Sequence, residues 1–185
     1  MPSPLGLVVC GAPLASRAAD VAHELTRAGW PLTVGITQAA TDWMDPDALS
    51  EAATVPTATR RRLPDEGRAS GRPDRVVAFP LTFNTANKIA RGVMDNHVTG
   101  TLCDALGTRA PIIASLFVND RLWDHPVWAS TLDTLSGAGV VFLDPHTGRL
   151  GEPVAVRSGT GGDVVDAFDP TWVVDALASP SAATA

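Results

Sequence analysis

The sequence is poor in three features that define whole classes of protein: long apolar runs, cysteine and basic charge. No stretch of the 185 residues approaches the roughly 18 uninterrupted apolar residues that a membrane helix needs. Residues 1–4 carry no basic side chain, and the apolar run at residues 5–10 is too short for a secretory signal. We therefore expect a cytoplasmic protein without a membrane partner.

The few cysteines and basic residues exclude further kinds of site and partner. Cys10 and Cys103 belong to no CxxC or Cys/His spacing, so no metal site is predicted, and a disulfide is not expected in a reducing cytosol. The formal net charge is −6, whereas nucleic-acid binding needs clustered Lys and Arg. The one basic cluster, residues 60–62, lies in a polar stretch and is interpreted as a solvated loop.

Short apolar runs alternate with helical patterns along the chain. The runs predict strands at residues 5–10, 32–36, 75–80, 111–116 and 140–143. The helical patterns occupy residues 15–28, 85–106, 126–138 and 170–177. This alternation predicts an α/β fold: a doubly wound, Rossmann-like (flavodoxin-like) parallel sheet of about five or six strands with helices on both faces.

The alternation forms one domain, which we expect to span residues 1–177, with residues 178–185 as a disordered tail. The polar segment 46–73 is predicted to be a surface excursion with a short helix near its start, and the alternative is a lid over a site. The glycine-rich residues 159–162 are a second candidate mobile loop.

Ligands of such sheets bind at the carboxyl ends of the strands, so the turns at those ends matter most. The first turn holds Gly11, Ala12, Pro13 and Leu14, and it suits either an anion at a helix N-terminus or an ordinary tight turn. The second turn begins at Thr37. Its hydroxyl is expected to cap the following helix, with phosphate binding as the alternative.

The third turn is the most informative. After the strand at residues 75–80, the chain presents Thr82, Asn84 and Thr85 in front of the next helical pattern. Amide and hydroxyl groups provide both hydrogen-bond donors and acceptors, which a heteroaromatic ring requires. This turn therefore predicts a site for such a ring.

Two motifs resemble those of a known family. Residues 80–85 read PLTFNT against the family's P-A-S-A-N-T, and residues 87–96 read NKIARGVMDN against N/A-K-x-A-x-G-x-x-D-N. Residues 116–123, LFVNDRLW, are similar to P-x-M-N-x-x-M-W, which is often followed by N-P and here by HP. The family is that of the homo-oligomeric flavin-containing cysteine decarboxylases, which include lantibiotic peptide decarboxylases and phosphopantothenoylcysteine decarboxylases. The resemblance covers about residues 5–143.

The resemblance implies FMN as the cofactor of a single flavin-binding domain. The FMN phosphate would lie near residues 11–14 and Thr37, and the isoalloxazine ring would lie against residues 82–85. The cofactor-binding residues implied in this way are Gly11, Ala12, Pro13, Leu14, Thr37, Thr82, Phe83, Asn84, Thr85 and Asp95.

The resemblance also implies a reaction and an assembly. Family members oxidise a cysteine, at a peptide C-terminus or on a small molecule, and release carbon dioxide to give an enethiol. Asn84 would hold the substrate carboxylate, and Asn119 and Trp123 would contact the substrate. Because family members form trimers or multiples of trimers with FMN at a subunit interface, we expect a homo-oligomer.

The chain departs from the family where the catalytic base is expected. Against the family's T-K-S-S-x-H-F, residues 37–43 read TQAATDW, so Asp42 takes the place of histidine. Imidazole titrates near neutrality, whereas an ordinary aspartate, with a pKa of about 3.9, becomes a comparable base only when burial raises its pKa. Asp42 is therefore either a substituted base or a plain charge at a helix N-terminus. The altered segment 116–123 points to a substrate other than the usual ones.

Three functions are compatible with these residues. The first is an oxidative decarboxylase or related oxidoreductase acting on a small thiol-carboxylate or a peptide C-terminus, with Asp42 and Asn84 as catalytic residues. The second is a non-catalytic FMN-binding or regulatory protein that acts through a partner. A flavin prenyltransferase of the same fold ranks below both, because no additional Ser/Arg/Lys-rich phosphate site is evident. The four histidines are interpreted as structural, with His97 and His125 nearest to the expected site.

Overall fold

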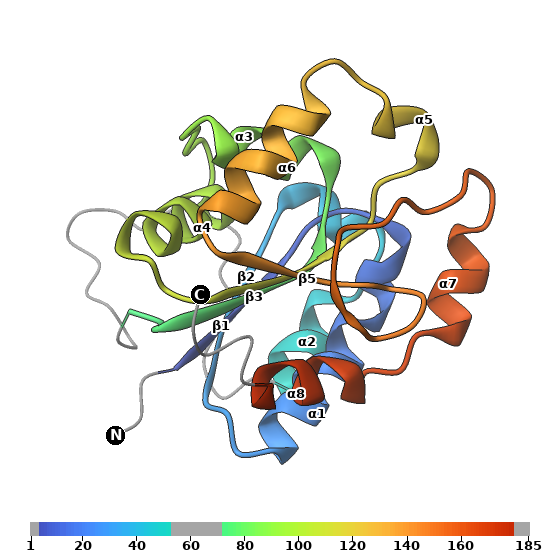
Figure 1. Cartoon of the computed structure of the whole chain (residues 1–185). Helices are drawn as coiled ribbons and strands as arrows, with labels where there is room; N and C mark the ends of the chain where they lie inside the picture. The colour runs from blue at the N-terminus through green and yellow to red at the C-terminus, as the bar shows by residue number, and fades with distance from the viewer. Residues whose placement is uncertain (1–3, 53–71, 180–185) are drawn as a thin grey trace.

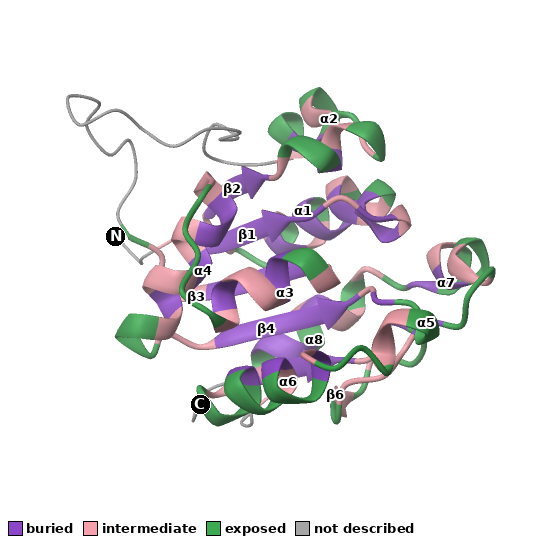
Figure 2. Ribbon diagram, turned by 90° about the horizontal axis from the view of Figure 1, so that it is seen from above, coloured by how far each residue is buried: buried purple, intermediate pink, exposed green. Residues whose placement is uncertain are grey.

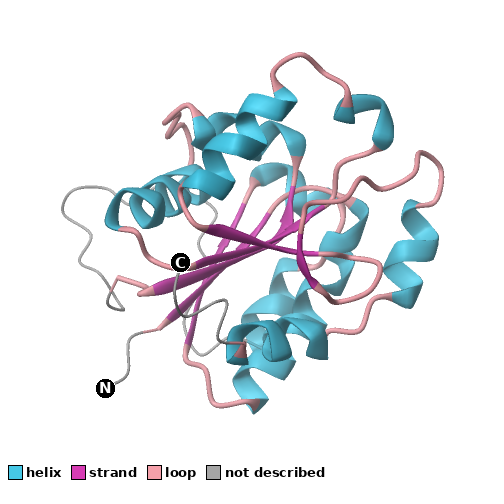
Figure 3. Ribbon diagram, viewed as in Figure 1, coloured by secondary structure: helices cyan, strands magenta, loops and turns pink. Residues whose placement is uncertain are grey.

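A computed structural model describes residues 4–52 and 72–179 as a central sheet with helices on both faces (Figures 1 and 3). The basic cluster at residues 60–62, most of the segment 46–73 and most of the expected tail lie outside the described residues. Their interpretation as a solvated loop, an excursion or lid, and a tail therefore stays a prediction.

Within the described residues, the sheet has six strands in the order β2-β1-β3-β4-β5-β6. The strands are β1 (Leu5–Val9), β2 (Leu32–Ile36), β3 (Arg75–Leu81), β4 (Ile112–Leu116), β5 (Val140–Leu143) and β6 (Leu150–Gly151). Neighbouring strands are parallel except β5 and β6, which are antiparallel. The predicted doubly wound parallel sheet is confirmed, and β6 adds a short edge strand that the sequence did not predict.

Helices form one layer on each face of the sheet. Helices α1, α2 and α8 lie on one face, and α3, α4 and α6 lie on the other (Figure 1). The helical elements are η1 (Pro13–Arg17), α1 (Ala18–Arg27), η2 (Gln38–Asp42), α2 (Pro46–Ala52), α3 (Phe83–Ala90), α4 (His97–Thr108), α5 (Asp120–Trp123), α6 (Trp128–Gly137), α7 (Gly161–Ala167) and α8 (Thr171–Ala178).

Alternating side chains of the strands build two separate cores. In β1, Leu5 and Leu7 pack in the core under α1 and α8, whereas Val8 packs in the core under α3 and α4. Both faces of the inner strands are buried (Figure 2), as is usual for a parallel sheet covered by helices. The sheet is therefore a rigid apolar platform, and polar side chains that can bind a ligand occur mainly where the strands end.

The helical pattern at residues 85–106 forms two helices, so the prediction of one long helix was wrong. Helix α3 ends at Ala90, and Gly92 adopts φ of 70°, a left-handed conformation that glycine tolerates best. Helix α4 then begins with a capping box. Asn96 Oδ1 accepts the Thr99 N–H (3.0 Å), and Thr99 Oγ1 accepts the Asn96 N–H (3.1 Å). The break allows α3 to pack against α6 while α4 packs against β2 and β3.

Two short helices were also not predicted. Helix α5 follows β4 directly, in the segment that the sequence treats as a substrate loop. Helix α7 begins at Gly161, so the second half of the expected mobile loop at residues 159–162 is the first turn of a helix. That part of the loop prediction was wrong, because α7 packs against η1 and is held in place by it.

Candidate functional site

The carboxyl ends of β2, β1, β3 and β4 lie side by side, and backbone hydrogen bonds join the loops that leave them. The Thr37 N–H donates to the carbonyl of Val9 (2.9 Å), and the Cys10 N–H donates to the carbonyl of Pro80 (3.2 Å). The Phe117 N–H donates to the carbonyl of Leu81 (2.9 Å). These bonds place the first four loops along one edge of the sheet, in the order of their strands.

The strand order reverses between β1 and β3, because β2 lies on one side of β1 and the later strands lie on the other. In doubly wound sheets, the crevice at this switch point is where ligands bind. The loops on its two sides are residues 10–14 after β1 and residues 82–85 at the start of α3. Those are the loops to which the sequence assigned most of the cofactor-binding residues.

Gly11 brings the first two loops into contact. A Cβ atom built on Gly11 would lie 2.5 Å from the carbonyl oxygen of Ala39, so no other residue fits without moving backbone. Ala12 and Leu14 are buried, and Leu14 packs in the core under α1. The turn can therefore offer a ligand mainly backbone groups, as an anion site near a helix N-terminus requires.

Thr37 carries a hydroxyl that the protein does not use. Its Oγ1 is buried and has no hydrogen-bond partner among the described residues. The expectation that this hydroxyl caps the following helix was wrong, because η2 has no side-chain cap at Thr37. Buried polar atoms are nearly always paired, so an unpaired hydroxyl beside the Gly11–Ala39 contact marks a place for a ligand atom.

Two further buried polar atoms lack a partner within the part of the chain that the structure describes. They are Ser115 Oγ, in the last-but-one residue of β4, and Trp128 Nε1, in the first residue of α6. The Trp128 ring packs on Phe83, the first residue of α3 (centroids 5.0 Å apart). All three unpaired groups therefore lie toward the carboxyl edge of the sheet.

In the third loop, the Thr82 hydroxyl stabilises the helix, whereas the Asn84 amide has no partner among the described residues. Thr82 caps α3: its Oγ1 accepts the Thr85 N–H (3.5 Å) and donates to Thr85 Oγ1 (3.3 Å). Asn84, in the first turn, is exposed, and its side chain makes no hydrogen bond to any described residue. Its amide is free to bind a ligand.

The Cys10 thiol lies beneath this loop. Burial raises the pKa of Cys10 above its ordinary value, and hydrogen bonds with Thr85 and Thr82 oppose the shift only in part. The thiol therefore stays protonated at neutral pH and acts as a small apolar residue. Among the described residues, no group of three or more His, Cys, Asp and Glu side chains could hold a metal ion.

Asp95 lies in the turn after α3, and its carboxylate is already bound. Lys88 Nζ is 2.5 Å from Asp95 Oδ2, and Asp95 Oδ1 accepts from Asn96 Nδ2 (2.9 Å) and Thr99 Oγ1 (3.3 Å). The hydrogen bond from Lys88 lowers the pKa of Asp95 below its ordinary value. The structure thus shows Asp95 linking α3 to α4, and its role toward a cofactor stays a prediction.

Asn119 and Trp123 lie at the two ends of α5, which follows β4. Asn119 is exposed, and its Oδ1 caps the helix by accepting the Leu122 N–H (3.1 Å), which leaves the amide nitrogen for a ligand. Trp123 is half-buried and packs edge-on against Trp128 (5.6 Å). These two predicted substrate residues therefore lie on one short helix that follows β4.

Four aromatic side chains, Phe83, Trp123, His125 and Trp128, form what we call the aromatic cluster. Phe83 packs on Trp128 (5.0 Å) and meets the His125 ring edge-on (5.4 Å, 70°). The cluster joins the third loop to the segment around α5. Three of its members, Phe83, Trp123 and His125, were noted separately in the sequence, but their contacts could not be predicted because residues 83 and 128 are distant in the chain.

Asp42 ends η2, on the loop that begins with Thr37. Its side chain is exposed and has no hydrogen bond or ion pair with the described residues. The next residue, Trp43, is also unusually exposed for a tryptophan. The structure therefore places Asp42 near the carboxyl end of β2, and its side chain has no polar partner among the described residues.

Residues 156–161 cross the same edge from the C-terminal part of the chain. Val156 donates to the carbonyl of Val118 (2.8 Å), and its own carbonyl accepts the Asp120 N–H (3.0 Å). A Cβ built on Gly161 would lie 3.5 Å from the Phe117 ring and 3.8 Å from the Pro13 ring. This segment therefore joins the fourth loop to the first.

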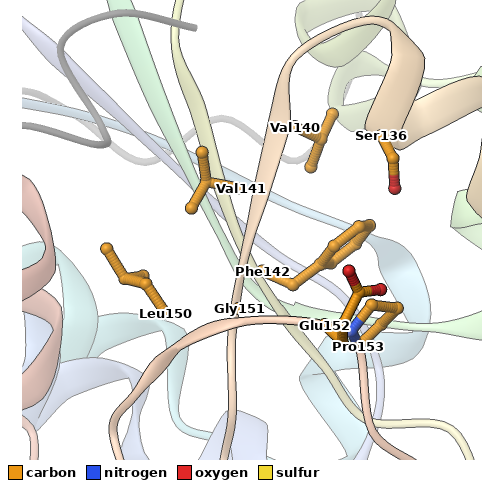
Figure 4. Close-up of a pocket in the computed structure, with 8 residues that line it drawn as sticks. All are labelled: Ser136, Val140, Val141, Phe142, Leu150, Gly151, Glu152 and Pro153. Carbon is orange, nitrogen blue, oxygen red and sulfur yellow. The ribbon is translucent and has the colours of Figure 1, made fainter.

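A cavity of about 290 Å³ lies elsewhere, at the far edge of the sheet (Figure 4). Its lining comes from the end of α6, β5, β6 and the residues that follow. It contains none of the residues that the sequence assigned to a site. Within the described chain, no helix is both long and apolar enough to cross a bilayer.

A doubly wound sheet with an unpaired hydroxyl and an open amide beside its switch point defines a ligand-binding α/β protein of the Rossmann-like class. The chain belongs to the Flavoprotein family, whose model matches residues 2–167.

Its relatives carry related names. The chain is 28% identical over 145 residues to the coenzyme A biosynthesis bifunctional protein CoaBC of Thermococcus kodakarensis. The matched region covers 76% of this chain and 36% of that protein. It is 26% identical over 150 residues to a probable phosphopantothenoylcysteine decarboxylase of Streptococcus mutans, covering 78% of this chain and 83% of that protein. The chain thus spans about a third of the bifunctional relative and most of the shorter one.

A solved structure supports the same assignment. The FMN-dependent cysteine decarboxylase TvaF from thioviridamide biosynthesis superposes with a TM-score of 0.69 at 25% identity, over 78% of this chain and 91% of that chain. The resemblance inferred from residues 80–96 is thereby confirmed at the level of family and fold.

Proposed function

We propose that this chain binds FMN at the β1/β3 switch point and uses it to oxidise and decarboxylate a small thiol-carboxylate or a peptide C-terminus. The observation that carries the proposal is the buried, unpaired hydroxyl of Thr37 beside the contact of Gly11 with Ala39. A phosphate oxygen would satisfy that hydroxyl, and the first turn offers backbone groups on its other side.

The residues present fit FMN in their chemistry as well as in their place. The backbone of residues 11–14 and the Thr37 hydroxyl provide neutral groups that suit a phosphate, and residues 82–85 provide donors and acceptors for a flavin ring. Bound FMN would supply the two-electron oxidation that makes loss of carbon dioxide from a thiol-carboxylate feasible.

The remaining roles belong to side chains of this protein. The free amide of Asn84 donates hydrogen bonds to the substrate carboxylate and fixes its orientation. The amide nitrogen of Asn119, whose oxygen is occupied as a helix cap, provides a further donor. Trp123 forms an apolar wall, and Asp42 stands where a base would take a proton from the substrate.

One observation favours the alternative of a non-catalytic FMN-binding or regulatory protein. Asp42 is exposed, and within the described residues its carboxylate has no hydrogen-bond or ion-pair partner that would orient it as a base. In this alternative the flavin binds, but no thiol-carboxylate reduces it.

We also propose that the chain acts as a homo-oligomer, a trimer or a multiple of trimers, as the family resemblance implies. Three large apolar side chains are more than two-fifths exposed: Trp43 (46%), Val93 (42%) and Met94 (45%). A partner copy that covers them would remove costly apolar surface from water. Sedimentation of the purified protein tests this assembly directly.

The absorbance spectrum of the purified protein tests the main proposal. We expect it to take up FMN, and we expect the flavin to bleach under anaerobic conditions when N-acetyl-L-cysteine is added. The variant Asn84→Asp, saturated with FMN, should bleach more than about a hundredfold more slowly than the wild type, because its charge repels the carboxylate. Flavin that binds and never bleaches with any thiol-carboxylate supports the regulatory alternative, and absence of FMN binding refutes both.

A further inference from the structure

We propose that His125 is a second substrate-binding residue, which donates a hydrogen bond from Nε2 to the carboxylate that Asn84 holds. The inference rests on the proposed function and adds to it a residue that the sequence analysis interpreted as structural. It arises from three features of His125: how its backbone is held, which ring nitrogen carries the proton, and what its ring touches.

The backbone of His125 is fixed on both sides. Its N–H donates to the carbonyl of Leu122 (3.2 Å), and its carbonyl accepts the Trp128 N–H (2.8 Å). These bonds attach the residue to the end of α5 and to the start of α6. The exposed side chain of His125 therefore extends from a backbone held by two hydrogen bonds. This limits the conformational entropy that the residue loses when it binds a ligand.

A hydrogen bond also fixes the tautomer of the ring. His125 Nδ1 accepts the Val127 N–H (3.3 Å), so in the neutral imidazole the proton must be on Nε2. The inner nitrogen is occupied by the protein, and the outer nitrogen is a donor that no described residue accepts. A carboxylate is the strongest simple acceptor for such a donor.

The ring of His125 contacts Phe83, the residue that precedes Asn84. The two rings meet edge-on with centroids 5.4 Å apart, and Asn84 follows Phe83 in the first turn of α3. A carboxylate bound beside Phe83 would therefore be within reach of both the Asn84 amide and the Nε2–H of His125. Phe83 and His125 are also two positions at which the chain departs from the family pattern, and here they contact each other.

The carboxylate is a better match for these donors than a phosphate dianion. The charged side chains of the segment that carries His125 are Asp120, Arg121 and Asp124, which together are net negative. A singly charged group is repelled less strongly by Asp120 and Asp124 than a dianion is. We therefore expect the group bound here to be the reactive carboxylate itself.

Two substitutions separate this role from a purely structural one. In His125→Asn, the side-chain oxygen replaces Nδ1 as acceptor for the Val127 N–H, but the outer donor is lost. In His125→Gln, the amide nitrogen reaches the position of Nε2, so the outer donor is kept. N-acetyl-L-cysteine and N-acetylcysteamine form the matched pair of probes, because they differ only in the carboxylate.

The experiment measures anaerobic bleaching of the FMN-loaded protein against N-acetyl-L-cysteine concentration, with N-acetylcysteamine as a competitor. For His125→Asn we expect the half-saturating concentration of N-acetyl-L-cysteine to rise about tenfold or more, as loss of a hydrogen bond to a charged group predicts. For His125→Gln we expect a rise of no more than about threefold. The inhibition constant of N-acetylcysteamine and the affinity for FMN should be unchanged in both.

Three results overturn the proposal. Equal losses in the two variants assign His125 to the structure of the turn, and so does an equal loss of N-acetylcysteamine binding. A wild-type holoprotein that N-acetyl-L-cysteine does not bleach also rejects the carboxylate site. If the wild type binds no FMN, the proposed function fails first, and the FMN titration shows that failure separately.

Discussion

Gly11 and Ala39 touch so closely that a single added methyl group at Gly11 would lie 2.5 Å from the Ala39 carbonyl oxygen. The contact is with backbone, so no change of side-chain conformation relieves it. It joins the loop after β1 to the loop after β2, on the two sides of the proposed phosphate site.

The first prediction concerns this contact. Gly11→Ala should lower the free energy of unfolding by about 1–3 kcal/mol, because the loops must separate to admit the methyl group. It should also weaken FMN binding about tenfold or more, because the separation moves groups on both sides of the phosphate. Thermal unfolding and FMN titration measure the two effects.

Gly107→Ala is the matched control. Gly107 lies in α4, and no atom is within 4 Å of the position of an added Cβ. Alanine is the better helix former, so this variant should be as stable as the wild type or up to about 1 kcal/mol more stable. A Gly11→Ala protein that behaves like the control would show that the loops are not packed as described.

The second prediction is that the Thr37 hydroxyl contributes to FMN binding and not to the stability of the fold. Thr37→Val removes a buried hydroxyl that has no partner among the described residues, so the protein without FMN should be no less stable. The same change should weaken FMN binding about tenfold, since a hydrogen bond to a charged phosphate is lost. The measurement is a denaturation curve with and without FMN.

Thr99→Val provides the contrast, because the Thr99 hydroxyl is part of the capping box of α4. Loss of that cap should cost about 1 kcal/mol whether or not FMN is present. The proposed phosphate site would be wrong if Thr37→Val destabilised the protein without FMN and left FMN affinity unchanged.

The third prediction tests whether Asp42 is a base. Asp42→Asn keeps the shape and removes the ability to accept a proton, so bleaching by N-acetyl-L-cysteine should slow by about a hundredfold or more. Asp42→His should retain activity, because imidazole is the stronger base near neutral pH. Single-turnover rates measured in an anaerobic stopped-flow instrument provide the comparison.

The same variants can also show that Asp42 is not a base. Wild-type rates in Asp42→Asn would assign Asp42 to a charge near a short helix and would remove it from catalysis. FMN affinity should be equal in all three proteins, because the carboxylate has no hydrogen bond or ion pair with the described residues assigned to the phosphate site.

The fourth prediction concerns acid stability. The hydrogen bond from Lys88 lowers the pKa of Asp95 in the folded protein. A carboxyl group whose folded pKa is depressed contributes stability above its unfolded pKa of about 3.9, and that contribution is lost as pH falls through the folded pKa. Stability should therefore fall below about pH 4 in the wild type, and less steeply in Asp95→Asn.

Denaturation midpoints between about pH 3 and pH 7 test this dependence. Asp133→Asn is the control, because Asp133 is exposed on α6 and has no ion pair within the described part of the chain. The assignment to Asp95 fails if the two variants lose the same amount of stability on acidification.

Much of the fold could be predicted because its signals are local. The cores of β1 to β5 were found from short apolar runs, since a strand buried on both faces needs mainly apolar side chains. The division of residues 85–106 was missed although Gly92, Asn96 and Thr99 all signal a helix end and a new cap. The apolar periodicity continues across the break because α3 and α4 line the same core, and it hid the turn.

The candidate site was predictable only in part. The motif at residues 80–85 lies on one turn, so its residues were bound to be close in space. The contact of Gly11 with Ala39, the unpaired state of Thr37 and the aromatic cluster depend on how separate loops pack. No pattern of spacing in the sequence encodes those distances.

Residues 156–161 and α7, which join the fourth loop to the first, are synthesised after all the strands of the sheet. Arg17, beside the first loop, donates to the carbonyl of Val165 in α7, 148 residues later in the chain (3.0 Å). Contacts between residues so far apart in sequence form late, because a long loop must close before they are made. During synthesis, the β1, β2 and β3 strands are therefore available to pair well before the ligand edge is closed. The edge that holds the proposed cofactor loops is therefore complete only after the ribosome has passed α7, and we expect stable FMN binding to require the whole of that segment.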